Sequence, residues 1–210
     1  MDKYQLTIII EQIIYDNDVV AVYPFGSRVY NTNSLESDYD FVMVIKSEPE
    51  SDHKEINLFG TCLDFNVYSL KTFKKMIEEH DICALECLST PEEIRFFDRK
   101  EIELPLINLS TLRKSISSVC NNSWVKCKKK LTVEKDEEYI GKKSLYHSFR
   151  IIKFGIQLAI YGKIVDFSEC NRQFYKEILE SPNDWEYLKQ RYKEEHNNLM
   201  SQFRKLAPKG

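Results

Sequence analysis

The amino-acid sequence predicts an α+β protein built from two parts, residues 1–105 and residues 106–210. The first part holds β-branched and aromatic runs in which apolar and polar residues alternate, as they do in half-buried strands. The second part keeps the three-to-four-residue apolar spacing of amphipathic helices almost throughout. Because Pro105 stands where the spacing changes, we expect a domain boundary there and a helical C-terminal domain after it.

Apolar spacing predicts the elements of the first part in order. An amphipathic helix is expected over residues 4–15, and residues 46–55, which include Pro49, are expected to form an exposed turn. Strands are expected over residues 19–25, 40–45 and 63–70. The second of these strands is nearly apolar throughout, which favours a central position in the sheet.

After residue 70 the pattern is mainly helical. A short strand is expected at residues 94–97, and Gly162 and the turn at residues 181–183 are expected to interrupt the later helices. Helices are expected over residues 71–79, 82–88, about 110–131, about 136–161 and about 168–205.

Composition excludes several classes of protein. The 210 residues are 42% apolar and 30% charged, with 6 Gly and 6 Pro, which is neither a disordered nor a fibrous composition. No apolar run approaches the roughly 18 residues that span a bilayer, and the N-terminus lacks a secretory leader. We therefore expect a cytoplasmic protein with no membrane partner. The six cysteines form no Cys-x-x-Cys pair, so we expect them to be small buried apolar side chains.

The segment from Phe25 to Asp40 carries the chemistry. Gly26 and Ser27 follow a predicted strand, and such a turn exposes backbone N–H groups and a hydroxyl that can hold phosphate. Asp38 and Asp40 stand at the start of the next strand and share one face of it, because alternate residues of a strand point the same way. Clustered carboxylates repel each other unless a cation neutralises them, and Mg²⁺ or Mn²⁺ suits oxygen ligands.

Asp64 is a third candidate ligand. It lies in a predicted strand between Leu63 and Phe65, where an isolated carboxylate needs a partner or a metal. If this strand lies beside Asp38 and Asp40, the three carboxylates form a two-metal site for in-line displacement at phosphorus.

This pattern resembles the polymerase-β-like nucleotidyltransferase superfamily. The string Phe-Gly-Ser-Arg-x-Tyr followed by Ser-Asp-Tyr-Asp is similar to that of a group of small bacterial and phage nucleotidyltransferases, except that Asn31 stands where that group commonly has Gly. The resemblance is strong over residues 20–70. It implies a minimal mixed sheet flanked by helices, and Asn31 can still adopt the left-handed backbone of a Gly.

The resemblance also implies roles for the motif residues. Gly26 and Ser27 would hold the triphosphate, Asp38 and Asp40 would bind both metals, and Asp64 would complete the metal that activates the acceptor hydroxyl. The implied reaction transfers a nucleoside monophosphate from a nucleoside triphosphate such as ATP to an acceptor and releases pyrophosphate. Arg28 could contact a phosphate or pair with Glu36 or Asp38, and both alternatives stay open.

Charge is distributed unevenly along the chain. Residues 1–109 carry 10 basic and 21 acidic side chains, whereas residues 110–163 carry 12 basic and 4 acidic ones. The basic segment 113–153 is expected to line the cleft and bind the triphosphate or an RNA or DNA acceptor; the alternative is a solvated helix face. Within it, Lys143, His147 and Arg150 share a helical face that could meet the phosphates, and Tyr146 could stack on a base.

The sequence leaves the acceptor open. The basic segment favours a nucleic acid 3′ end. The alternatives are a protein or small-molecule hydroxyl, as in toxin–antitoxin or antibiotic-modifying relatives, and a catalytically silent nucleotide- or RNA-binding module.

Overall fold

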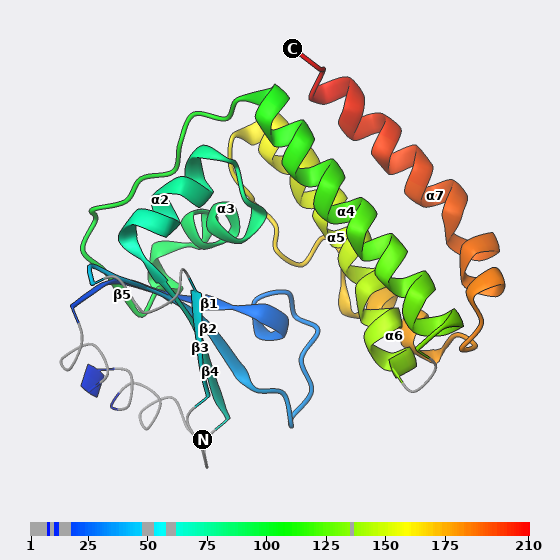
Figure 1. Cartoon of the computed structure of the whole chain (residues 1–210), viewed down its shortest axis with the longest axis horizontal. Helices are drawn as coiled ribbons and strands as arrows, with labels where there is room; N and C mark the ends of the chain where they lie inside the picture. Colours follow the sequence, from blue (N-terminus) through cyan, green and yellow to red (C-terminus); the bar gives the residue numbers. More distant parts are fainter. Residues whose placement is uncertain (1–7, 9–10, 13–17, 48–52, 58–61, 135–136) are drawn as a thin grey trace. The chain divides into compact units, whose positions relative to one another are not determined.

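A computed structural model describes residues 8, 11–12, 18–47, 53–57, 62–134 and 137–210 of the chain (Figure 1). The chain divides into two compact units. The sheet unit holds most of the chain up to Pro105, and the helical unit holds residues 106–210 together with the short segments 30–32 and 79–82.

The sheet unit is built on a mixed five-stranded sheet with the order β3-β4-β2-β1-β5. The strands are β1 (Val19–Phe25), β2 (Tyr39–Ile45), β3 (His53–Asn57), β4 (Leu63–Ser69) and β5 (Phe97–Asp98). β2 and β4 are parallel, and the other neighbouring pairs are antiparallel. The nearly apolar β2 lies at the centre, as its sequence predicts.

Each face of the sheet has its own apolar cluster. Val42 and Val44 of β2 pack with Phe73 and Ile77 of helix α2 (Leu70–Glu78) and with residues of helix α3 (Ile82–Ser89). The opposite face gathers Phe41, Met43, Phe65 and their neighbours. Because strand residues alternate in direction, the even-numbered residues of β2 all point toward the α2–α3 side.

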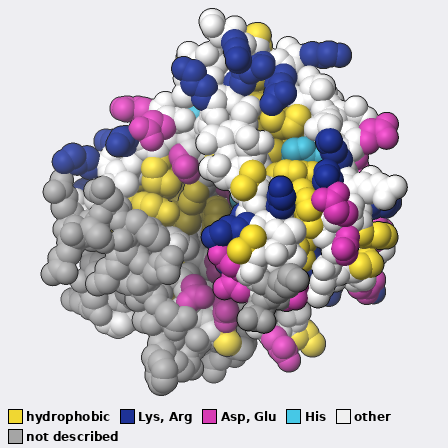
Figure 2. Space-filling model, turned by 45° about the vertical axis from the view of Figure 1, so that its right-hand side comes forward, with side chains coloured by type: hydrophobic (Ala, Val, Ile, Leu, Met, Phe, Trp, Pro, Cys, Tyr) yellow, Lys and Arg dark blue, Asp and Glu magenta, His cyan; other side chains and the backbone are white. Residues whose placement is uncertain are grey.

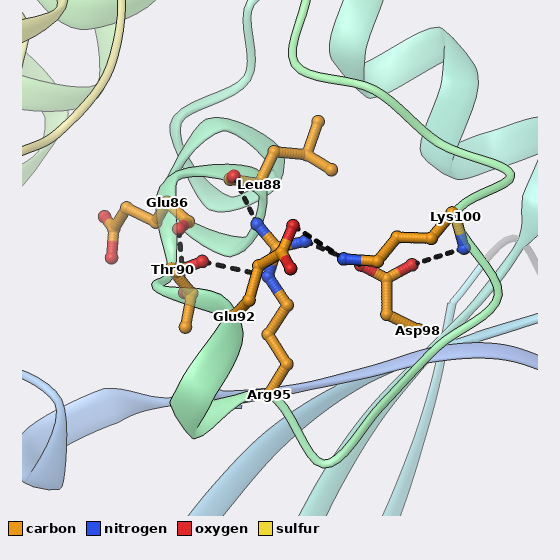
Figure 3. A network of polar contacts seen from close by, with 7 residues as sticks. All are labelled: Glu86, Leu88, Thr90, Glu92, Arg95, Asp98 and Lys100. Carbon is orange, nitrogen blue, oxygen red and sulfur yellow. Dashed lines mark hydrogen bonds and ion pairs between the residues drawn. The ribbon is translucent and has the colours of Figure 1, made fainter.

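Arg95 ties the end of α3 to the edge of the sheet (Figure 3). Its Nε donates to Thr90 O and its Nη2 to Leu88 O, each at 2.9 Å, while its Nη1 donates to Asp98 Oδ2 at 2.6 Å. The guanidinium thus satisfies carbonyls that α3 leaves open at its C-terminus. It also lies 5.6 Å from the ring centroid of buried Tyr23 in β1.

The helical unit contains α4 (Leu109–Thr132), α5 (Glu138–Tyr161), α6 (Arg172–Glu180) and α7 (Trp185–Leu206). Asn108, Asn171 and Asp184 cap α4, α6 and α7, since each side chain accepts a hydrogen bond from a backbone N–H of the first turn. Gly155 allows three helices to approach closely. A Cβ there would lie 2.9 Å from Ile116 of α4 and 3.1 Å from Phe203 of α7.

Two buried polar side chains of the helical unit, His196 and Lys142, have partners within it. The Cys120 thiol lies 3.2 Å from Nε2 of His196, and burial lowers the pKa of His196 to about 4, with Arg204 adding to the shift. Buried Lys142 donates to the carbonyls of Leu179 and Ser181, which closes the end of α6. Cys87, Cys120, Cys127 and Cys170 are buried, as expected, whereas Cys62 is exposed and Cys83 is partly exposed.

The structure confirms most of the predicted elements and corrects two. Residues 53–55 belong to strand β3 rather than to an exposed turn, because they pair with β4. Of the predicted strand 94–97, Ile94 ends the 3-10 turn η2 (Glu92–Ile94), residues 95–96 are irregular, and only Phe97 lies in a strand, the two-residue β5. The expected turn at residues 181–183 is confirmed, since it divides the helical stretch 168–205 into α6 and α7. The predicted helix 4–15 lies largely outside the described residues.

No helix in the described part of the chain is long and apolar enough to cross a membrane.

Replacing Arg95 tests how far α3 depends on it. We expect Arg95→Met to lower the free energy of unfolding by about 2–4 kcal/mol, because it leaves Asp98 and the carbonyls of α3 with fewer buried partners. Urea denaturation measures this change. Arg99→Met is the control, since the Arg99 side chain makes a long, exposed ion pair with Asp18 at 3.7 Å and lies 5.8 Å from the ring centroid of Phe97, and we expect it to cost under about 1 kcal/mol. Equal losses for the two variants would contradict the anchoring role of Arg95.

Candidate active site

Asp40 and Asp64 lie side by side where β2 and β4 begin. The two strands are parallel, and these residues are direct partners in their register. Neighbouring strands are about 4.8 Å apart, so the two carboxylates leave the sheet at adjacent points. Both point to the face that carries α2 and α3, and both side chains are partly exposed. The predicted pairing of these acids on adjacent strands is therefore present in the fold.

Gly26 leaves the space that the Asp40 carboxylate occupies. It begins the short turn η1 (Gly26–Arg28) after β1, with φ +74°, a backbone conformation that favours glycine. A Cβ at this position would lie 2.0 Å from Oδ2 of Asp40, which is far inside contact distance. The register explains the approach, because Phe25 of β1 is the direct partner of Asp40. Gly26 is therefore required for the position of a carboxylate.

Arg28 holds the segment that leads into β2. Its Nε donates to Asp38 O at 3.1 Å and its Nη2 to Ser37 O at 2.5 Å. Its guanidinium carbon also lies 3.7 Å from the ring centroid of Tyr39, a cation–π contact. Its described hydrogen bonds go to backbone carbonyls rather than to the carboxylates of Glu36 or Asp38. The geometry thus links Arg28 to the backbone that carries Asp38.

Asp38 is exposed and precedes the first residue of β2. The next residue, Tyr39, begins the pairing with β4 by donating its backbone N–H to Cys62 O at 2.7 Å. Asp38 thus lies two residues before Asp40, the partner of Asp64, and alternation places Asp38 and Asp40 on the same side of the strand. Ser27 is partly exposed within η1, and its role in holding phosphate stays a prediction.

The carboxylates fit a divalent metal by type and by register. Hard cations such as Mg²⁺ prefer carboxylate oxygens, and Asp40 and Asp64 present them at adjacent positions. Among the described residues, no set of three or more acidic, His or Cys side chains is already gathered closely enough to enclose an ion. Asp38 is the most exposed of the three acids.

The predicted nucleotide contacts on α5 differ in exposure. Lys143 is exposed, and its Nζ lies 5.4 Å from the ring centroid of Tyr139. Arg150 is buried, and its guanidinium lies 3.7 Å from the ring centroid of Tyr30 in the helical unit's segment 30–32. Its Nη2 donates to Nδ1 of His147 at 2.9 Å. The role of these three side chains in nucleotide binding stays a prediction.

His147 and Tyr146 lie deeper in the helical unit than Lys143 does. Burial lowers the pKa of the partly exposed His147 to about 3, with Arg150 and Lys126 adding to the shift, so the ring is neutral at pH 7. The expected stacking of Tyr146 on a base is wrong. Tyr146 is 5% exposed, and its hydroxyl donates to Cys170 O within the helical core.

Part of the predicted basic segment is neutralised locally. Glu134 accepts from Lys129 at 2.5 Å and from Lys130 at 2.6 Å, and Glu137 pairs with Lys130 as well. The hydrogen bonds from Lys129 and Lys130 lower the pKa of Glu134 to about 2. These acids follow α4 in the chain, so this stretch balances its own charge.

Two tyrosines of the motif make contacts with arginines that the sequence does not predict. Tyr39 stands between the two acids of the Asp-x-Asp motif, and only the folded turn shows that it stacks on Arg28. Tyr30 lies just beyond η1 and contacts Arg150 and Phe154 of α5. The only sequence signal for these contacts is that aromatic residues and arginines occur together in and near the motif. Asn31 has φ +56°, the left-handed backbone that the sequence comparison with Gly implied.

The match to a family of known proteins agrees with this geometry. Residues 7–107 match the nucleotidyltransferase domain family. A solved structure of a nucleotidyltransferase-like protein from Exiguobacterium sibiricum aligns with 96% of this chain and 72% of that one, at 10% identity and a TM-score of 0.33. Among curated proteins, none matches the sequence. The family match covers the Gly26 turn and all three acids, and we conclude that residues 7–107 are a nucleotidyltransferase domain of the polymerase-β-like superfamily.

Proposed function

We propose that this protein transfers a nucleoside monophosphate from a nucleoside triphosphate, such as ATP, to the 3′-hydroxyl of a nucleic acid. The observation that carries the proposal is the pairing of Asp40 with Asp64 beside Gly26, inside a nucleotidyltransferase domain. In the reaction, the acceptor oxygen forms a bond to the α-phosphorus and the bond from that phosphorus to the bridging oxygen breaks. Pyrophosphate leaves, and the hydroxyl proton passes to solvent.

Nucleotidyltransferases of this family generally use divalent metal ions. Asp38, Asp40 and Asp64 would hold Mg²⁺ or Mn²⁺, which when bound would neutralise phosphate charge and make the acceptor hydroxyl more acidic. The chain's own residues hold these carboxylates in place. Gly26 leaves the space for Asp40, and Arg28 fixes the backbone of Asp38.

Charge supports a nucleic acid as the acceptor. The helical unit carries the basic excess of the chain, and a polyanion gains more from dispersed lysines and arginines than a neutral hydroxyl compound does. If the enzyme transferred the monophosphate to a protein or small-molecule hydroxyl instead, the proposed acceptor would be wrong but the proposed reaction would stand.

Removing one acid tests the reaction itself. We expect Asp40→Asn and Asp64→Asn each to lower transfer of labelled monophosphate about 100-fold or more, because each removes a charge that would bind metal. The assay supplies each labelled nucleoside triphosphate with Mg²⁺ or Mn²⁺ and, separately, RNA, DNA and protein acceptors. Glu36→Gln is the matched control, since Glu36 is an exposed acid of the same segment, and it should change the rate under about twofold. Absence of transfer by the wild type to every acceptor would refute the proposal.

Gly26→Ala tests the space beside Asp40. We expect it to remove transfer almost completely while the protein still folds, because the new Cβ must displace the Asp40 carboxylate. Gly162→Ala is the matched control, since Gly162 has φ +72° but nothing within 4 Å of an added Cβ. Both variants should lose about 1 kcal/mol of stability from backbone strain, and only Gly26→Ala should lose activity. A fully active Gly26→Ala enzyme would show that Asp40 need not occupy this space.

Arg28→Lys separates a positioning role from a phosphate contact. A lysine keeps the charge but cannot donate to both carbonyls in the same planar arrangement. We expect kcat to fall about tenfold while the Kd of the nucleoside triphosphate, measured by calorimetry, changes less than about twofold. A raised Kd with kcat unchanged would instead assign Arg28 to phosphate binding.

A further inference from the structure

Three helix ends meet at one end of the helical unit. Gly155 of α5 lies against Ile116 of α4 and Phe203 of α7, so these positions share one level of the bundle. Seven residues of helix rise about 10 Å, which brings the start of α4, the end of α5 and the residues after α7 to the same end. The contact of Gly210 N with Ser110 Oγ at 3.3 Å agrees with this level.

This end is rich in cations and poor in acids. Residues 109–133, 139–165 and 196–210 contain no Asp or Glu. The exposed cations here, which we call the basic end, are Lys114, Lys163, Arg204, Lys205 and Lys209. Figure 2 shows Lys and Arg side chains gathered at the upper end of the molecule, where the start of α4 and the C-terminus lie in Figure 1.

The basic end differs from the other lysine-rich stretch of α4. Lys129 and Lys130 pair with Glu134 and Glu137, whereas no cation of the basic end makes an ion pair with any residue that the structure describes. The segment 79–82 brings acids toward this end, since His80 accepts the N–H of Asn108 at 2.8 Å and is flanked by Glu79 and Asp81.

Arg113 fixes the arrangement of the basic end. Its Nη1 donates to the carbonyls of Arg204 and Ala207, each at 2.9 Å, and so satisfies the C-terminus of α7. These bonds hold the backbone of Arg204 and its neighbours next to the first turns of α4. The cations of α4 and α7 are thus held together by a defined contact.

We propose that the basic end binds the phosphate backbone of a single-stranded nucleic acid. Unpaired lysines and arginines on three elements match a ligand with closely spaced negative charges, and binding releases the counterions of that ligand. Tyr161, the last residue of α5, lies two residues before Lys163 of the basic end. Its side chain is 59% exposed and offers a ring on which a base can stack. That this strand is the acceptor rests on the proposed function; that it binds here does not.

The test is binding of a fluorescein-labelled 20-nucleotide poly(U) or poly(dT) strand, measured by fluorescence anisotropy between 50 and 300 mM salt. The basic-end variant carries Arg204→Gln, Lys205→Gln and Lys209→Gln. We expect its Kd to rise about tenfold or more at low salt and its salt slope to fall by about 2, since each lost phosphate contact removes about 0.7 from the slope for a single strand.

The matched control removes the same charge elsewhere. It carries Lys128→Gln, Lys129→Gln and Lys130→Gln at the other end of α4, where two of the lysines are already paired, and we expect its Kd to change less than about threefold. Asp40→Asn should bind the strand as the wild type does, so a failed reaction and a failed surface are distinguishable. Equal losses for both triple variants, or no loss for the basic-end variant, would overturn the proposal. So would binding to phosphatidylserine vesicles, but not to the strand, through the basic end.

Discussion

The close approach of the Asp40 carboxylate to Gly26 constrains the whole candidate site. No residue with a side chain fits at position 26 while Asp40 stays where it is, because a Cβ would lie 2.0 Å from Oδ2. The contact arises from antiparallel pairing of β1 with β2, in which Phe25 faces Asp40. The turn that would hold phosphate and the carboxylate that would hold metal are therefore set by one strand register. A one-residue slip of β1 would separate them and would also exchange the buried side chains that β1 presents to the two apolar clusters.

Arginines stabilise the backbone on either side of this register. Arg28 bonds the carbonyls of Ser37 and Asp38 before β2, and Arg95 bonds those of Leu88 and Thr90 after α3. In both places the chain leaves regular structure and exposes carbonyls without intrahelical or interstrand partners. A planar guanidinium can satisfy several such acceptors at once, which a lysine cannot do with the same geometry. The site thus depends on side chains that need not touch substrate.

Local pattern was sufficient to predict β1, β2 and β4 and the acids, but not β3 or the contacts between the acids and the Gly26 turn. β1, β2 and β4 follow from alternation and β-branched residues, and the pairing of Asp40 with Asp64 follows once these strands are neighbours. β3 was missed because its sequence, His-Lys-Glu-Ile-Asn, is mostly polar and follows a charged stretch. It is a strand because β4 offers it a hydrogen-bonding edge, a tertiary influence that outweighs propensity. The role of Gly26 was likewise beyond the sequence, since it depends on register rather than on the turn alone.

The sequence likewise gives the number of charged residues in each segment, whereas the fold decides which of those charges neutralise one another. Summed by segment, α4 looks most basic at Lys128–Lys130, yet the chain reverses directly after this helix and brings Glu134 and Glu137 against those lysines. Sequence neighbours at a helix reversal neutralise one another, whereas cations at the opposite end of α4 meet the equally acid-free ends of α5 and α7. A charge total over a window of sequence therefore misplaces a surface when the chain folds back on itself. What decides the field at a surface is which helix ends share a level, and in this unit Gly155 and Arg113 set that level.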